Sequence, residues 1–159
     1  MSSSLQLLIN KFHNYIKYEK QYSEHTIKNY LIDLSQFKDN FDTDDISTIT
    51  TSNLQDYISS LHTMGLDSST IARKKSSISS LFNFFCKKKI IDKNPCKKLI
   101  SPKRKSKIPM VMSIEEITKL CDIKEDTFQA IRDKAIIDLM YSSALRLSET
   151  TSLNLSSID

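Results

Sequence analysis

Residues 68–86 read SSTIARKKSSISSLFNFFC, and this stretch decides the class of fold. Apolar side chains recur in it at intervals of three and four, the spacing that places them on one face of an α-helix. The predicted buried positions are Ile71, Ile78, Leu81, Phe82 and Phe85. The opposite face carries a cation followed by short polar side chains, namely Arg73, Ser76, Ser77, Ser80 and Asn83. The stretch therefore predicts an amphipathic helix that begins after Ser68 or Ser69.

The polar face of this helix suits a phosphate backbone. Short side chains let a helix come close to a polyanion, and Ser and Asn can hydrogen-bond to phosphate oxygens. Serine is a poor helix former, so a row of serines on one helix face favours a functional role for that face. An ordinary solvent-exposed face would have the same pattern, and the pattern alone leaves that alternative open.

Three more helices are predicted before this one. The first covers about residues 4–20, the second begins after a cap at Ser23, and the third begins after a cap at Thr51 or Ser52. Gly65, the one glycine of the chain, stands where a left-handed residue should end the third helix. Their predicted buried positions are Leu5, Leu8, Ile9, Phe12, Tyr15 and Ile16, then Ile27, Tyr30, Leu31, Leu34 and Phe37, then Leu54, Tyr57, Ile58 and Leu61.

The chain changes character after the fourth helix. Asn94-Pro95 should stop any helix, and residues 96–109 contain two prolines and six Lys or Arg without an acid. We interpret residues 93–109 as an extended basic linker. Ser113 and Glu116 form a capping box that opens a helix with Ile114, Ile117 and Leu120 inside. A longer helix from about Asp126 and a short one from near Ser148 follow, so we expect domains over 1–92 and 110–159.

The composition agrees with an all-α protein. The 159 residues contain one Gly and three Pro, so the usual residues of β-turns are scarce. There is no apolar run of the length that a membrane span needs, and no secretory signal at the N-terminus. The cysteines Cys86, Cys96 and Cys121 form no Cys-x-x-Cys pair, and the histidines are scattered. We therefore expect reduced cysteines, no metal site and a cytoplasmic protein.

Positive charge is concentrated in one segment. The net charge is +4, but residues 68–107 hold 13 Lys or Arg and a single acid, Asp92. The remaining residues hold 10 basic and 18 acidic side chains. A local positive field of this kind favours the capture of a polyanion, so nucleic acid is the preferred partner. A solvated lysine-rich surface remains the alternative.

Three segments share the pattern of one known family. Residues 131–135 read IRDKA and residues 141–149 read YSSALRLSE, close to R-D-x-A…Y-x-x-G-L-R-x-S-E-L. Residues 22–30 read YSEHTIKNY, close to S-x-x-T-x-x-x-Y. Asn94-Pro95, Ser101-Pro102-Lys103 and Ile108-Pro109 follow the order N-P…P-K…L-P. The chain thus resembles the N-terminal portion of the tyrosine recombinases, or phage integrases, and within them the XerC/XerD group.

The resemblance implies an all-α chain in two parts. A four-helix, SAM-like core-binding bundle would be followed by the truncated helical start of a catalytic domain. The family completes its active site further along, with a β-hairpin lysine, a His-x-x-Arg motif, a further His or Trp and a nucleophilic tyrosine. None of the six tyrosines here matches the context of that nucleophile, so we expect the chain to be inactive alone.

The implied reaction is DNA strand exchange through a 3′-phosphotyrosine intermediate, without a metal or another cofactor. The resemblance implies that Arg146 is the first catalytic arginine. A guanidinium suits this role because it stays charged and offers two donors to phosphate oxygens. Glu149 lies one helical turn further and could orient a neighbouring catalytic group. The alternative for Arg146 is a surface salt bridge with Glu149.

The resemblance also implies a C-shaped clamp around double-stranded DNA and partner recombinase protomers on adjacent half-sites. The residues expected to contact DNA are Thr26, Lys28, Asn29, Arg73, Lys74, Ser77, Ser80, Lys103, Arg104, Lys105 and Lys107. The implied function is site-specific recombination in chromosome dimer resolution or mobile-element integration. A non-catalytic DNA-binding fragment and a helical protein-interaction module remain alternatives.

The chain departs from the family pattern at two places. Ala144 replaces the glycine usual before Leu-Arg, and residues 150–152 are polar where the family usually has an apolar residue or two. If the turn before Arg146 needs a positive φ, Ala144 strains it by roughly 1 kcal/mol or more. We also expect residues 108–159 to be loosely held, with apolar patches exposed around Leu139, Met140 and Leu153.

Overall fold

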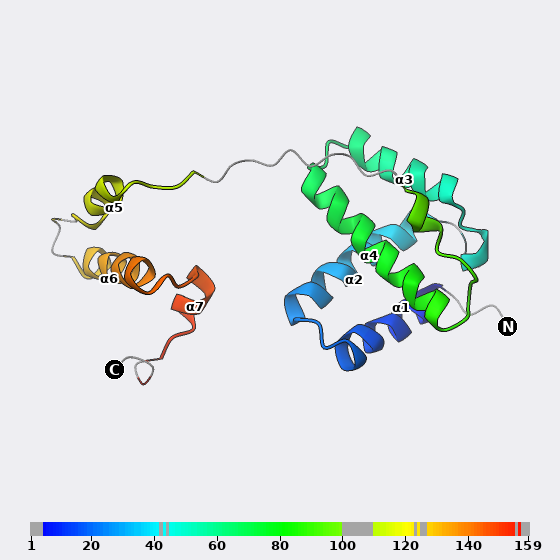
Figure 1. The fold of residues 1–159 in the computed structure, drawn as a ribbon, viewed down its shortest axis with the longest axis horizontal. Helices are drawn as coiled ribbons and strands as arrows, with labels where there is room; N and C mark the ends of the chain where they lie inside the picture. Colours follow the sequence, from blue (N-terminus) through cyan, green and yellow to red (C-terminus); the bar gives the residue numbers. More distant parts are fainter. Residues whose placement is uncertain are drawn as a thin grey trace. The chain divides into compact units, whose positions relative to one another are not determined.

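The computed structural model describes residues 5–41, 43, 45–99, 110–122, 124, 127–154 and 156, and all the regular structure in these ranges is helical. The chain divides into two compact units, Met1–Ser106 and Lys107–Asp159 (Figure 1). The predicted all-α class is confirmed.

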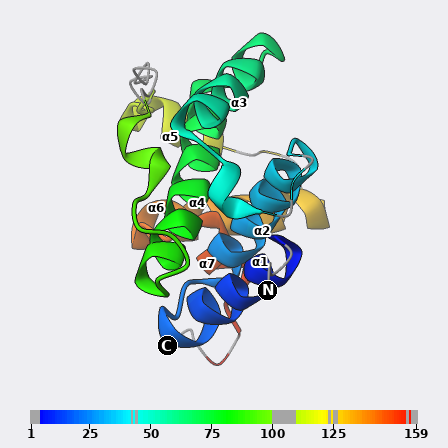
Figure 2. The same ribbon diagram turned by 90° about the vertical axis from the view of Figure 1, so that its right-hand side faces the viewer.

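The first unit is a four-helix bundle. It contains α1 (Leu5–Asn14), α2 (Glu24–Asp39), α3 (Thr51–Thr63) and α4 (Ser68–Lys87). The first helix continues into a π-helical turn, η1 (Tyr15–Glu19), and a 3-10 turn, η2 (Ile46–Thr48), precedes α3. Helix α4 packs against α1, α2 and α3, as both ribbon views show (Figures 1 and 2).

The predicted apolar faces make up most of the core of this unit. All the predicted positions on α1 to α4 are buried except Tyr15, Tyr30 and Leu31, which are half-buried against the same core. The largest fully buried side chains include Phe12, Phe37, Phe82 and Phe85. Burying one such side chain stabilises a fold by roughly 1.5–3 kcal/mol, so these four positions fix how the helices pack.

The helix ends follow the predicted signals with one shift. Ser23 caps α2, since its Oγ accepts a hydrogen bond from the Thr26 amide at 3.3 Å. The prediction of Thr51 or Ser52 as the cap of α3 is wrong: Thr50 caps it in a capping box with Asn53, whose Oδ1 accepts from the Thr50 amide at 2.9 Å. The Asn53 side chain accepts from the amide three residues before it, which belongs to Thr50, so the cap lies one residue before the predicted Thr51.

The end of α3 and the end of α4 have the same form. Gly65 has φ 77° and follows α3, as predicted. The Gly65 and Leu66 amides donate to the carbonyls of His62 and Leu61, which is a Schellman motif. After α4, Lys89 has φ 57°, and the amides of Lys89 and Ile90 donate to Cys86 and Phe85 in the same way.

The segment after α4 is partly folded, which corrects the predicted linker. Residues 93–109 were expected to be extended, but a 3-10 turn, η3 (Pro95–Lys98), packs against α3 and α4. The apolar residues Cys96 and Leu99 hold this turn in the core, where burial raises the pKa of the Cys96 thiol to about 12. The remainder of the predicted linker, residues 100–109, lies outside the described residues.

The second unit contains α5 (Ile114–Cys121), α6 (Phe128–Ser143) and α7 (Leu147–Thr151). The predicted capping box is confirmed, because the Ser113 amide donates to Glu116 Oε2 at 2.8 Å and the Glu116 amide donates to Ser113 Oγ. Helix α6 is capped by Thr127, and α7 begins one residue before the predicted start.

The predicted interior of the second unit is largely wrong. Ile114 and Leu120 are exposed, and Ala130 is the one buried apolar residue among residues described in this unit. The predicted exposed patches are misplaced as well, since Leu139, Met140 and Leu153 are half-buried while Phe128, Ile131 and Tyr141 are exposed. Three helices of this size have too little facing surface to cover the apolar stripes of one another.

Candidate nucleic-acid interface

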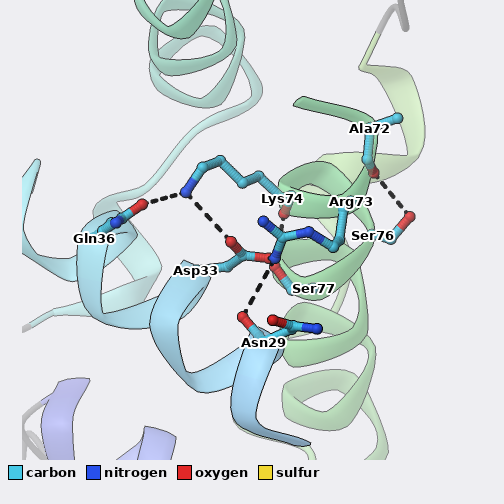
Figure 3. A network of polar contacts seen from close by, with 8 residues as sticks. All are labelled: Asn29, Asp33, Gln36, Ala72, Arg73, Lys74, Ser76 and Ser77. Atoms are coloured by element: carbon cyan, nitrogen blue, oxygen red, sulfur yellow. Dashed lines mark hydrogen bonds and ion pairs between the residues drawn. The ribbon is translucent and has the colours of Figure 1, made fainter. Parts of the chain in front are cut away.

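An ionic cluster with a buried carboxylate joins α2 to α4 (Figure 3). Asp33 on α2 is fully buried and meets two cations of α4. Its Oδ2 accepts from Arg73 Nη1, and its Oδ1 lies 3.3 Å from Lys74 Nζ. Lys74 also donates to Gln36 Oε1. One carboxylate therefore serves two cations, and the cluster keeps an excess positive charge.

Arg73 carries this charge to the surface. Its side chain is 38% exposed, whereas that of Lys74 is 4% exposed. Nη1 of Arg73 also donates to the backbone oxygen of Asn29 at 3.4 Å. The structure thus brings together two residues expected to contact DNA, Asn29 and Arg73, at the α2–α4 surface.

Two of the expected contacts on α4 point inward, which corrects the sequence analysis. Lys74 and Ser77 are buried, and Ser77 Oγ donates to the Lys74 carbonyl at 2.8 Å (Figure 3). Lys74 lies three residues after Ile71 and four before Ile78, and Ser77 lies four residues before Leu81. Both residues therefore belong to the core-facing stripe. A buried side chain cannot reach a phosphate in this conformation, so the two residues leave the set of expected DNA contacts.

The other expected contacts of the first unit reach the surface. Lys28 is exposed, while Thr26 and Ser80 are half-buried. Thr26 Oγ1 shares a hydrogen bond of 2.9 Å with Ser23 Oγ at the start of α2. Lys103, Arg104, Lys105 and Lys107 lie outside the described residues.

Asp33 was not predicted as part of the site, although the sequence contains a signal for it. Asp33 stands three residues after Tyr30 and four before Phe37, both on the apolar face of α2. An acid at such a position must find a positive or donor partner in the core. Among the described helices that pack against α2, α4 carries the most Lys and Arg, so an ion pair between the two helices could have been expected.

The polar anchor formed by Asn94 was also missed. Its Nδ2 donates to the Ser79 carbonyl at 3.1 Å and to Asn83 Oδ1 at 2.8 Å, while its Oδ1 accepts from the Cys96 amide. Lys75 Nζ donates to the Leu99 carbonyl. These bonds fix residues 94–99 on α4, and they leave Lys97 and Lys98 exposed. The Asn-Pro pair therefore caps a turn against the bundle.

Arg146 lies in the second unit, directly before α7. Its side chain is 82% exposed, and its guanidinium pairs with Glu149, with 3.0 Å between Nη1 and Oε1. Glu149 Oε2 also accepts from the Arg146 amide at 2.7 Å. The salt bridge that the sequence left open as an alternative is thus present, and it holds Arg146 at the N-terminus of α7. Ala144, two residues earlier, has φ 52°.

Two kinds of feature are absent from the part of the chain that the structure describes. No three or more His, Cys, Asp or Glu side chains gather there in a group that could hold a metal ion. No helix there is long and apolar enough to cross a membrane.

Comparison with known proteins places these features in a family. The family described as "Phage integrase, N-terminal SAM-like domain" matches residues 9–89, which is more than half of the chain. Tyrosine recombinase XerC of Natranaerobius thermophilus is 34% identical over 93% of this chain and 51% of its own length. Tyrosine recombinase XerD of Oceanobacillus iheyensis is 30% identical over 97% of this chain and 53% of its own length.

A third relative, tyrosine recombinase XerC of Thermodesulfovibrio yellowstonii, is 34% identical over 99% of this chain and 52% of its own length. The chain thus spans about half the length of the curated relatives that it matches. The match to the family covers part of α1 and all of α2, α3 and α4, so it includes both helices that form the ionic cluster. The chain belongs to the phage integrase family, through its N-terminal SAM-like domain.

Proposed function

We propose that this chain supplies duplex-DNA binding and the first catalytic arginine to a tyrosine recombinase that exchanges DNA strands at a specific site. The relatives that it matches are named tyrosine recombinases XerC and XerD. Their names support the reaction class, and the motif around Arg146 supports the role of that residue.

The main support for DNA binding is the concentration of positive charge on α4 and in the residues that follow it. Residues 68–107 hold 13 cations and one acid. Among the described residues of this segment, Arg73 is held beside Asn29, and Lys97 and Lys98 are exposed after the Asn94 anchor. Cations on one surface of a helical bundle attract the phosphates of DNA and position the protein on the duplex.

In this proposal Arg146 binds the non-bridging oxygens of the phosphate that reacts. Attack on that phosphate builds negative charge, which fixed donors stabilise most effectively. A guanidinium presents two parallel donors and stays charged at every accessible pH. Glu149 holds the Arg146 backbone at the start of α7 and orients the side chain.

The wider role is part of the same proposal. The chain would act on DNA in the cytoplasm, beside partner protomers on adjacent half-sites. Chromosome dimer resolution and mobile-element integration both fit a site-specific recombinase of this group.

Fluorescence anisotropy on the full 159-residue chain tests the proposal. The labelled duplexes would carry a Xer-type half-site or a scrambled sequence, and the affinity would be measured across a salt series. If about six cations engage phosphates, log affinity should fall against log salt with a slope of about −5. Tighter binding of the half-site would support a recombinase of the Xer group.

Two charge-matched variants locate the surface. Lys28→Gln on α2 should weaken binding and flatten the salt slope by about one. Lys11→Gln on α1 also removes one exposed lysine, but outside α2 and α4, and should leave the slope unchanged. Absence of binding at low salt would contradict the proposal and favour a protein-interaction module, and equal binding of both duplexes would favour a non-catalytic DNA-binding role.

A further inference from the structure

We infer that Asp33 is a positioning residue, which holds the Arg73 guanidinium at the α2–α4 surface as a clamp for a DNA phosphate. The inference rests on the proposed DNA binding and adds to it the residue that orients the contact. Asp33 itself is fully buried and touches no DNA.

The first support is the geometry of the guanidinium. Nη1 of Arg73 donates both to Asp33 Oδ2 and to the Asn29 carbonyl. Among the described residues, Nε and Nη2 of Arg73 have no protein partner. One nitrogen is therefore fixed by α2, and the Nε–Nη2 edge stays open to donate two parallel bonds to phosphate oxygens.

The second support is the charge of the cluster. Asp33 cannot neutralise both Arg73 and Lys74, and Gln36, the further partner of Lys74, is neutral. The excess positive charge is available to a ligand only through Arg73, because the Lys74 side chain is 4% exposed. A partly desolvated guanidinium with an excess charge binds an anion more strongly than a freely moving lysine does.

The third support is the conformational entropy that the Arg73 side chain would lose when it binds a phosphate. A free arginine side chain loses rotamer freedom when it binds a phosphate, whereas a guanidinium already held by a buried carboxylate has lost that freedom on folding. The Asp33–Arg73 pair therefore prepares the contact before DNA arrives.

Removal of the Asp33 charge should change the DNA affinity in the direction opposite to that expected from charge repulsion alone. Removal of an acid near a DNA surface normally strengthens binding, because repulsion of the phosphates falls. If Asp33 positions Arg73, its removal weakens binding instead. Asp33→Asn alone leaves Lys74 buried without its counter-ion and endangers folding, so the test uses a paired change.

The paired variant is Asp33→Asn with Lys74→Met, which removes both buried charges and leaves the net charge at +4. Lys74→Met alone is the matched control, because it keeps the Asp33–Arg73 pair. Arg73→Gln gives the effect of losing the clamp. Circular dichroism and thermal unfolding establish that each variant is folded, and anisotropy with a mixed-sequence duplex gives the affinity over a salt series.

We expect the paired variant and Arg73→Gln each to lose about tenfold in affinity and about one unit of salt slope. Adding Arg73→Gln to the paired variant should cost nothing further, because both changes remove the same contact. Lys74→Met should bind with nearly the wild-type affinity. Wild-type affinity of the folded paired variant, or additive losses in the triple variant, would overturn the inference.

Arg73→Lys provides a test that does not depend on the buried pair. It keeps the charge, but a single amine cannot hold Asp33 and a phosphate at once with fixed geometry. Affinity close to that of Arg73→Gln supports the clamp, and affinity equal to that of the wild type overturns it. Failure of the wild-type chain to bind duplex DNA would instead refute the proposed function, so the two failures are distinguishable.

Discussion

Ala144 adopts a left-handed backbone conformation between α6 and Arg146. Its φ and ψ are 52° and 30°, where a side chain costs about 1–2 kcal/mol relative to the right-handed region. The turn that reverses the chain after Ser143 imposes this conformation, and it sets the direction in which α7 and Arg146 start. Ala144 thus strains the segment that carries the candidate catalytic residue.

Ala144→Gly should therefore stabilise the second unit. The relief of strain is partly offset by the greater freedom of glycine in the unfolded chain, which leaves a gain of about 0.5–1 kcal/mol. Hydrogen exchange of the amides of α6 would show slower opening in the variant. Ala135→Gly, inside α6, is the control and should lower the free energy of opening by about 1 kcal/mol. A destabilising effect of Ala144→Gly would show that the left-handed conformation of Ala144 is not strained.

Individual residues show where sequence reasoning succeeds and fails. The sequence raised a positive φ before Arg146 only as a condition, from the glycine of the family pattern, and Ala144 meets that condition with φ 52°. The burial of Lys74 and Ser77 was not expected, because polar residues near an apolar stripe were assigned to the opposite, exposed face of the helix. Only the register of α2 against α4, which places Asp33 beside Arg73 and Lys74, shows that two charges can share the core.

At the scale of the element, two helices end in the same motif with different residues. Gly65 after α3 and Lys89 after α4 both have positive φ and both donate to the last turn of the preceding helix. A Cβ built at Gly65 would meet nothing within 4 Å, so the cost of a side chain there comes from the backbone alone.

The two positions predict changes of opposite sign. Gly65→Ala should lower the free energy of unfolding by about 1 kcal/mol, and Lys89→Gly should raise it by about 0.5–1 kcal/mol. Urea unfolding of the 159-residue chain measures both. Lys89→Ala removes the charge but keeps the strain, so it should have little effect; a gain equal to that of Lys89→Gly would show that charge, rather than φ, matters at this position.

The elements of the first unit could be predicted almost completely from the sequence. Helical periodicity gave their number and buried faces, and Ser23 and Gly65 gave two of their ends. The shift of the α3 cap to Thr50 depends on how far the Asn53 side chain reaches, and periodicity carries no such information. The turn at Pro95–Lys98 was missed because its packing rests on two apolar residues, Cys96 and Leu99, within a basic stretch.

At the scale of the whole molecule, the two units differ in how much apolar surface they bury. The first has a continuous core formed by all four helices. In the described part of the second, Ala130 is the one buried apolar residue, and the side chain of Phe128 is 78% exposed. The sequence predicted helices in both units correctly, but the burial of their apolar faces depends on tertiary partners that periodicity does not reveal.

Hydrogen exchange should therefore separate the two units. The amides of α1 to α4 should be protected up to the free energy of global unfolding, whereas those of α5 to α7 should open with much smaller free energies. Exchange followed by mass spectrometry of peptic fragments resolves the helices individually. Equal protection in both units would show that the second unit is stabilised in a way that its described contacts do not explain.

We propose that the face built by α2, α4 and the turn Pro95–Lys98 binds DNA. Titration of the 15N-labelled chain with a duplex, followed by amide and arginine side-chain chemical shifts, tests it most directly. We expect the chemical-shift changes to concentrate at Thr26, Lys28, Asn29, Arg73 and residues 97–107. The signals of the exposed face of α1 around Lys11 should stay unchanged. Shifts confined to α1 and α3, or no shifts at low salt, would contradict it.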